Sequence, residues 1–245
     1  MFTLSLTEWI FTGLAAFLIG FSKTGLPGMS PIIVIIMATV FPAKESTGVL
    51  LPMLVFADIF AVSFYRHHAQ WKILLRLLPL AVAGIISGFF FMGRINSEQL
   101  KTVIGAVILA MLLAVILIKW KNITINKLNL PLAGFTGAIA GFTSMISNAA
   151  GPVMTVYLIS MDVNKKDFVG SRAWFFATLN LIKIPFSAGL GLITFESLIF
   201  DAKLLPSILA GAFVGYILVK IIPQKIFNIA VQVLAAGSAV YILIV

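Results

Sequence analysis

The sequence predicts an all-α polytopic membrane protein, folded as one membrane domain over residues 1–245, and three observations support that fold class. The chain is 61% hydrophobic and only 10% charged, with a mean hydropathy of +1.12, whereas soluble domains carry about 25% charged residues. Its two halves resemble each other. Each half also opens on a pair of apolar segments too short to span a bilayer singly.

The internal repeat is visible at two fixed offsets. At an offset of 121 residues the first half matches the second at two glycines, a phenylalanine, a proline and a lysine: Gly13, Gly20, Phe21, Pro31 and Lys44 against Gly134, Gly141, Phe142, Pro152 and Lys165. At an offset of 127, Leu78, Pro79, Gly84 and Gly88 match Leu205, Pro206, Gly211 and Gly215. We therefore divide the chain into repeats 1–121 and 122–245, an arrangement typical of secondary transporters.

Each repeat is predicted to contain a broken-helix hairpin and three transmembrane helices. The hairpins are formed by the short segments 5–20 with 28–41 and 130–142 with 149–161, because Gly and Pro interrupt the helix at 21–28 and 143–151. Six segments approach the ~20 residues needed to cross the hydrocarbon as helix. They are 46–65, 73–92 and 98–118 in the first repeat and 168–188, 202–219 and 226–245 in the second.

The distribution of lysine and arginine predicts the orientation. If each hairpin returns to the side from which it entered, ten basic residues lie on one side and four on the other, whereas hairpins that cross once would give seven against seven. The positive-inside rule selects the first arrangement, with cytoplasmic loops at 66–72, 119–129, 162–167 and 220–225 and both termini periplasmic. Each half then makes an odd number of crossings, so the repeats are inverted and a binding site is expected near the midplane.

Several function classes are disfavoured. The net charge of +9 belongs to short loops between apolar segments, which explains it without nucleic acid. The chain has no cysteine, and its two histidines, His67 and His68, are adjacent in a polar loop, so we predict no metal site and no cofactor. An intramembrane aspartyl protease would need a second embedded acid beside Asp58, so we predict no enzyme. A channel would need a continuous polar pore, whereas the polar residues here gather at two breaks.

The two breaks are the candidate substrate site. A helix that restarts inside the membrane presents unpaired N–H groups and the positive end of its dipole, which favours an anion. Small polar side chains could add donors there, or could merely satisfy the interrupted backbone. The candidate binding residues are Ser22, Lys23, Thr24, Gly25 and Gly28 at the first break and Thr143, Ser144, Ser147, Asn148 and Gly151 at the second.

Embedded ionisable residues extend this site, because charges in the membrane are costly and usually functional. Lys183, beside Asn180, could hold the substrate charge, although it could also reach outward to the membrane surface. Asp58 is the candidate coupling residue, which would take a proton or another cation. Arg172 lies about two turns inside its segment, and we slightly prefer a position at the membrane interface for it.

The segments Gly20-Phe21-Ser22-Lys23-Thr24-Gly25-Leu26-Pro27-Gly28, Asn148-Ala149-Ala150-Gly151-Pro152 and Thr178-Leu179-Asn180-Leu181-Ile182-Lys183-Ile184-Pro185 resemble the TauE/SafE family of sulfite exporters. The resemblance covers nearly the full chain. It implies secondary transport of sulfite, sulfonates or related organosulfur anions across the bacterial inner membrane, in a lipid bilayer and with a small anionic substrate. A transporter or channel for a carboxylate, for phosphate, or for a cation at Asp58 remains the alternative.

Overall fold

The computed structural model describes residues 4–100, 102–103, 106, 130–161, 163–231 and 233–234, and within them every long regular element is a helix. Most of predicted segments 98–118 and 226–245 lies outside these residues. In chain order the helices are α1 (Leu6–Thr24), α2 (Ser30–Val40), α3 (Ala43–Tyr65), α4 (Trp71–Arg94), α6 (Leu130–Ser147), α7 (Gly151–Ser160), α8 (Lys165–Gly189) and α9 (Phe195–Ile221). Among the described helices α3, α4, α6 and α9 are long and apolar enough to cross a membrane. The predicted fold class, an all-α membrane protein, is confirmed.

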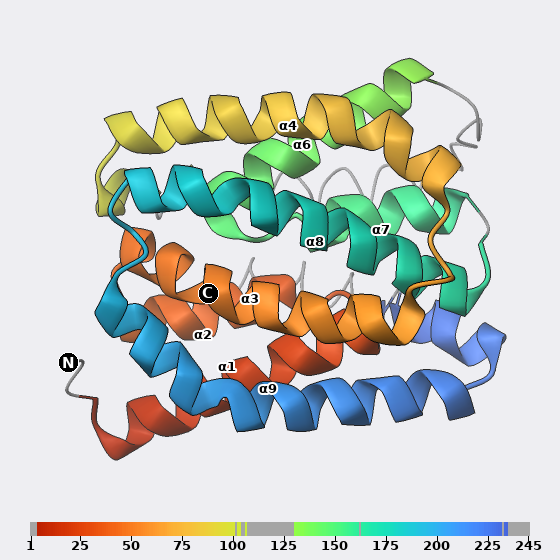
Figure 1. Ribbon diagram of the computed structural model, residues 1–245, viewed down its shortest axis with the longest axis horizontal. Coiled ribbons are helices and arrows are strands. Elements are labelled where there is room, and N and C mark those ends of the chain that lie inside the picture. The colour runs from red at the N-terminus through yellow and green to blue at the C-terminus, as the bar shows by residue number, and fades with distance from the viewer. Residues whose placement is uncertain are drawn as a thin grey trace.

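The pairs α1–α2 and α6–α7 enter the molecule from opposite ends, and α6 is longer than the predicted segment 130–142, long enough to span a membrane. In Figure 1, α1 and α2 enter and leave on the left, whereas α6 and α7 enter and leave on the right. Helix α3 crosses from left to right and α4 returns, while α8 crosses from right to left and α9 returns. Each pair therefore behaves as a hairpin whose turn lies inside the molecule.

Glycines set the contacts between α1 and α9 and between α4 and α6. A Cβ at Gly20 would lie 2.0 Å from the Ile208 carbonyl oxygen, and one at Gly141 would lie 1.9 Å from that of Ala81. Ile208 follows Ala81 by 127 residues and Gly141 follows Gly20 by 121, the two offsets of the sequence repeat. The absence of side chains at both glycines lets the helix backbones touch, so the same close contact occurs in each half.

The connections after α3 and α8 show the same correspondence. The connection after α8 packs through Leu192 on Gly48 of α3, where a Cβ would lie 2.0 Å from the Leu192 carbonyl oxygen. The connection after α3 packs through His68 on Gly170 of α8, where a Cβ would lie 2.8 Å from His68. Helices α3 and α8 therefore form the centre of the molecule, each covered at one end by a loop of the other half.

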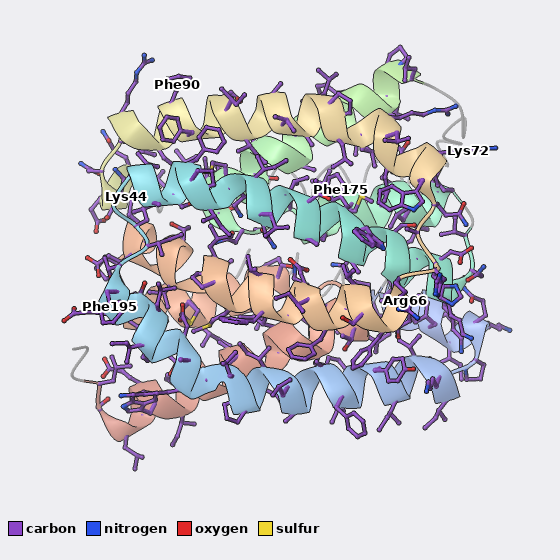
Figure 2. All side chains as sticks on the ribbon, viewed as in Figure 1. Lys44, Arg66, Lys72, Phe90, Phe175 and Phe195 are labelled. Atoms are coloured by element: carbon purple, nitrogen blue, oxygen red, sulfur yellow. The ribbon has the colours of Figure 1, made fainter. Side chains whose placement is uncertain are left out.

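The outer surface is apolar between two ends that carry basic residues. Phe90 and Phe195 point outward and are 56% and 78% exposed, whereas Phe175 is enclosed between helices (Figure 2). Lys44 lies at one end of the molecule and Arg66 and Lys72 at the other (Figure 2). An apolar band of this kind suits contact with lipid tails, and charged ends suit the two interfaces.

Candidate functional site

The helix breaks are shorter than the sequence predicts. Helix α1 continues through Thr24 and α6 through Ser147, so the polar residues at 22–24 and 143–147 form the last turns of helices. A residue with positive φ occurs in each break, Gly28 (115°) in the first and Asn148 (55°) in the second. The following helices start at Ser30 and Gly151, each with a proline in the first turn. The remaining first-turn N–H groups have no carbonyl within their own helix to bond.

A cavity lies beside the start of α2 and the second helix break. Its wall combines residues of both breaks with residues of α3 and α8. The lining residues are Ile19, Ser22, Lys23, Ser30, Ile33, Val34, Leu50, Leu54, Ser144, Asn148, Arg172, Phe176 and Asn180. Five of the predicted binding residues are among them: Ser22, Lys23, Ser144, Asn148 and Asn180.

The Lys23 ammonium is paired with a carboxylate. Its Nζ lies 2.6 Å from Oδ1 of Asp58, whose side chain is 2% exposed. The other carboxylate oxygen accepts a hydrogen bond of 2.6 Å from Nδ2 of Asn180. Asp58 therefore joins α1 to α8 from its position on α3, and it neutralises the charge that Lys23 brings to the cavity.

Lys183 is buried. Helix α8 extends to Gly189, so Lys183 lies more than a turn before the end of the helix and not at the membrane surface. Its Nζ donates to Oδ1 of Asn148 at 2.5 Å, to Oγ of Ser144 at 3.2 Å and to Oδ1 of Asn180 at 3.3 Å. A lysine ammonium has three donors, so these bonds occupy all of them. The alternative that Lys183 reaches outward to the membrane surface is wrong.

Arg172 also lies inside, and its expected position at the interface is wrong. The side chain is 3% exposed and lines the cavity. Its Cζ lies 5.4 Å from the centre of the Phe176 ring, and Lys23 Nζ lies 4.9 Å from the same ring. The sequence does contain a signal for this placement, since Arg172, Phe176, Asn180 and Lys183 recur every three or four residues and so share one face of a helix.

Two predicted binding residues of the first break face another helix. The Thr24 hydroxyl donates to the carbonyl oxygens of Gly20 and Ala212, at 3.1 and 2.6 Å. Gly25 lies against α9, where an added Cβ would be 2.7 Å from the Cα of Gly215. Neither residue lines the cavity, and nor does Gly28. Thr24 and Gly25 instead hold α1 against α9. Lys23 and Thr24 are consecutive residues of a helix and so point in different directions, and only Lys23 reaches the cavity.

The second break shows the same division. The hydroxyls of Thr143 and Ser147 donate to backbone carbonyls one turn earlier, at 2.7 Å to Ile139 and 2.8 Å to Thr143. These two side chains satisfy the backbone of α6 and are not part of the cavity wall. Gly151 does not line the cavity either, but it brings the starts of α7 and α2 together, since an added Cβ would lie 2.4 Å from Oγ of Ser30.

One further buried acid, Asp201, was not predicted from the sequence. The expected segment began at 202, whereas α9 begins at Phe195 and so includes Asp201 in its second turn. The side chain is 0% exposed, and within the described part of the chain neither carboxylate oxygen has a hydrogen-bond partner. It is not among the residues that line the cavity.

Comparison with known proteins gives one match. The profile of a protein family described as "Sulfite exporter TauE/SafE" matches residues 12–242. Neither the search of curated proteins nor the search of solved structures returned a significant match. The matched range includes both helix breaks and the whole cavity wall. The chain is therefore a multi-pass membrane protein that belongs to the sulfite exporter TauE/SafE family.

Proposed function

We propose that the protein is a secondary transporter that exports a small sulfur-containing anion, bound in the cavity between the two helix breaks. The charge of the cluster around this cavity carries the proposal. It contains three cationic side chains, Lys23, Arg172 and Lys183, and one carboxylate, Asp58. When all four are ionised the cluster has a net charge of +2 in an enclosed site, where uncompensated charge is costly. A bound anion would supply the missing negative charge.

The chemistry of the cavity suits a sulfur oxyanion. Ser22, Ser30 and Ser144 provide hydroxyl groups on its wall, and Ser30 belongs to the first turn of α2, whose N–H groups have no partner within their own helix. Sulfite carries three oxygens that accept several hydrogen bonds at once, and as a dianion it would balance the charge of the cluster. A cation centred on Asp58 is disfavoured, because the Lys23 ammonium already occupies one carboxylate oxygen at 2.6 Å.

Reconstitution into lipid vesicles tests this function. We expect vesicles that contain the protein and radiolabelled sulfite to release it with a rate that saturates with concentration. An interior-negative potential should accelerate release, since moving one charge through 100 mV changes the free energy by about 2.3 kcal/mol. Competition by methanesulfonate, phosphate and acetate ranks the substrate classes. A current that rises linearly with concentration would instead indicate a channel, and release no faster than from empty vesicles would reject the proposal.

We also propose that residues 1–121 and 122–245 are inverted repeats, which is the architecture that lets one half move against the other. The equivalent contacts of Gly20 and Gly141 and the opposite directions of the hairpins support this (Figure 1). The membrane is the bacterial inner membrane, with both termini periplasmic. A single cysteine at His67 of this cysteine-free chain should stay unlabelled by an impermeant reagent in intact cells, and one at Glu98 should be labelled. The reverse pattern would overturn the orientation.

Asp58 is our proposed carrier of a coupled proton, because it is the one carboxylate in the described charge cluster. Export of an anion down the membrane potential can also proceed without coupling. A pH-sensitive dye inside sulfite-loaded vesicles distinguishes the two modes. Coupling predicts a change of internal pH that tracks sulfite release in proportion, whereas release without any pH change removes Asp58 from the mechanism.

A further inference from the structure

We infer that Arg172 is the side chain that contacts the transported anion, and that Lys183 positions the surrounding groups without contacting it. This rests on the proposed function, since it names the ligand within the same cavity. The three cations of the charge cluster, Lys23, Lys183 and Arg172, differ in the donors and the charge that they leave available for a substrate.

Lys23 is a weak candidate for the anion ligand, because Asp58 neutralises its charge. Asp58 Oδ1 lies 2.6 Å from its Nζ, a short charge-assisted contact. The other two donors of the ammonium remain, but an anion that bound them would meet an ion pair whose charge is already balanced. An anion that displaced the carboxylate would leave Asp58 enclosed with Asn180 as its remaining partner at 2.6 Å, which is unfavourable for a buried charge.

Lys183 has charge but no free donor. Its three bonds, to Asn148, Ser144 and Asn180, match the three donors of an ammonium group. Each amide is also bound at its other end, since Nδ2 of Asn148 donates to the Thr47 carbonyl at 3.0 Å and Nδ2 of Asn180 donates to Asp58. Ser144 accepts from Lys183 and thereby keeps its own O–H to donate into the cavity it lines. Lys183 therefore orients its neighbours and adds a positive field.

Arg172 is the cation with donors to spare. Within the described residues its Nε has no hydrogen-bond partner, and its Nη1 reaches the Ser22 carbonyl only at 3.5 Å, beyond the usual range for such a bond. No carboxylate among the described residues lies within ion-pair distance of the guanidinium. A guanidinium carries five N–H donors, so most of them are available to a substrate on the cavity wall that Arg172 lines.

Arg172 also lies beside the first turns of two helices. An added Cβ at Gly151, the first residue of α7, would lie 2.4 Å from Oγ of Ser30 and 3.8 Å from Nη2 of Arg172. The guanidinium therefore lies where the starts of α2 and α7 meet, one helix from each half of the chain. Its planar fork can bind two oxygens of one oxyanion, while a serine hydroxyl on the cavity wall can donate to the third.

Calorimetric titration of sulfite into purified protein tests the assignment. Arg172→Gln removes the charge and the fork, and we expect the dissociation constant to rise at least about thirtyfold, since hydrogen bonds to charged groups are the strong ones. Arg172→Lys keeps the charge but loses the fork, and we expect about a tenfold rise. Arg94→Gln makes the same chemical change at the exposed end of α4, and binding should stay within about twofold of the parent.

The outcomes separate the inference from the function on which it rests. If the parent binds and transports sulfite and a folded Arg172→Gln variant binds within about threefold of it, Arg172 is not the ligand and the proposed function stands. If the parent neither binds nor transports a sulfur oxyanion, the proposed function fails first. Should Arg172→Gln not fold, Arg172→Lys decides, because it keeps the buried charge: a tenfold loss supports the fork and unchanged binding rejects it.

Discussion

The two halves of the molecule share their packing but differ in their charges. Gly20 and Gly141 make equivalent backbone contacts, at 2.0 and 1.9 Å for an added Cβ. At the offset of 121 residues, however, Lys23 corresponds to Ser144, and at the offset of 122 that relates α3 to α8, Asp58 corresponds to Asn180 and Lys183 to Ala61. The first half thus contains a cation with its own counter-charge, and the second contains a cation held only by neutral groups.

This difference shows which features a repeated fold must keep. Where two helix backbones touch, any side chain beyond hydrogen would force the helices apart, so both copies need glycine there. The polar groups of the cavity face space, and each copy can carry a different one without moving the backbone. The repeated part of the molecule is thus the packing of its helices, while the part that differs gives the site its sign of charge.

The largest effect should come from removing the counter-charge of the first half. Asp58→Asn leaves the Lys23 ammonium enclosed without its carboxylate, and we expect a loss of about 3 kcal/mol in the free energy of unfolding, typical of a broken buried pair. Lys23→Gln with Asp58→Asn removes both charges and should recover most of the loss. Denaturation in detergent measures both variants. If the double variant is no more stable than Asp58→Asn, the loss of stability does not come from the unpaired Lys23 ammonium.

The shared packing gives the next effect. Gly20→Ala and Gly141→Ala each place a methyl group within about 2 Å of a backbone carbonyl, and overpacking of this kind costs about 2 kcal/mol. Both variants should lose thermal stability to a similar extent, because the two contacts are equivalent. Gly13→Ala is the matched control, since an added Cβ there meets nothing within 4 Å. Unequal losses at Gly20 and Gly141 would contradict the equivalence of the halves.

Much of this fold could be predicted from the sequence, because hydropathy, Gly-Pro interruptions and the repeat offsets are properties of whole segments. Within the site the sequence indicated Lys23 and Asn180 but could not separate Lys23 from Thr24. The two are adjacent at the end of α1, and only the rotation of that helix sends one to the cavity and the other to the Ala212 carbonyl.

Arg172 shows the second limit of sequence reasoning. An arginine about two turns inside a helix can extend to the membrane surface or turn inward, and both conformations satisfy the same sequence pattern. Tertiary packing decides between them, here through Phe176 and the start of α7. Asp201 was missed for a related reason, since the predicted segment began one residue after it and boundaries from hydropathy are uncertain by a few residues.

The third prediction concerns Lys183, the cation of the second half that is bound by neutral groups. Lys183→Gln removes a cation that has no counter-charge, so stability should hardly fall, in contrast to Asp58→Asn. Sulfite affinity should decrease about tenfold, or about 1.4 kcal/mol, because the field weakens and Asn148 and Asn180 lose a shared donor. Lys166→Gln on the exposed surface of α8 is the control for titration. A variant that binds sulfite as tightly as the parent would exclude Lys183 from the site.

The smallest effect concerns the loops that cover the two ends of the molecule. Asp167 accepts a hydrogen bond of 2.7 Å from Nε2 of Gln70 and lies 3.2 Å from Nδ1 of His68, which fastens the loop after α3. Glu45, its equivalent at an offset of 122, is exposed, and no described residue of the loop after α8 bonds to it.

Asp167→Asn should therefore loosen the loop after α3, together with the bond of 2.8 Å that Asp167 accepts from Nδ2 of Asn164 at the start of α8. We expect about 1 kcal/mol less protection of the amides at 66–70 in hydrogen exchange, the usual contribution of such a bond. Glu45→Gln is the matched change in the other half and should leave the amides at 190–194 unaltered, because the contact of Leu192 with Gly48 involves backbone and not a carboxylate. If both variants loosen their loops equally, the two ends are fastened alike. The difference between the halves would then be confined to the charges around the cavity.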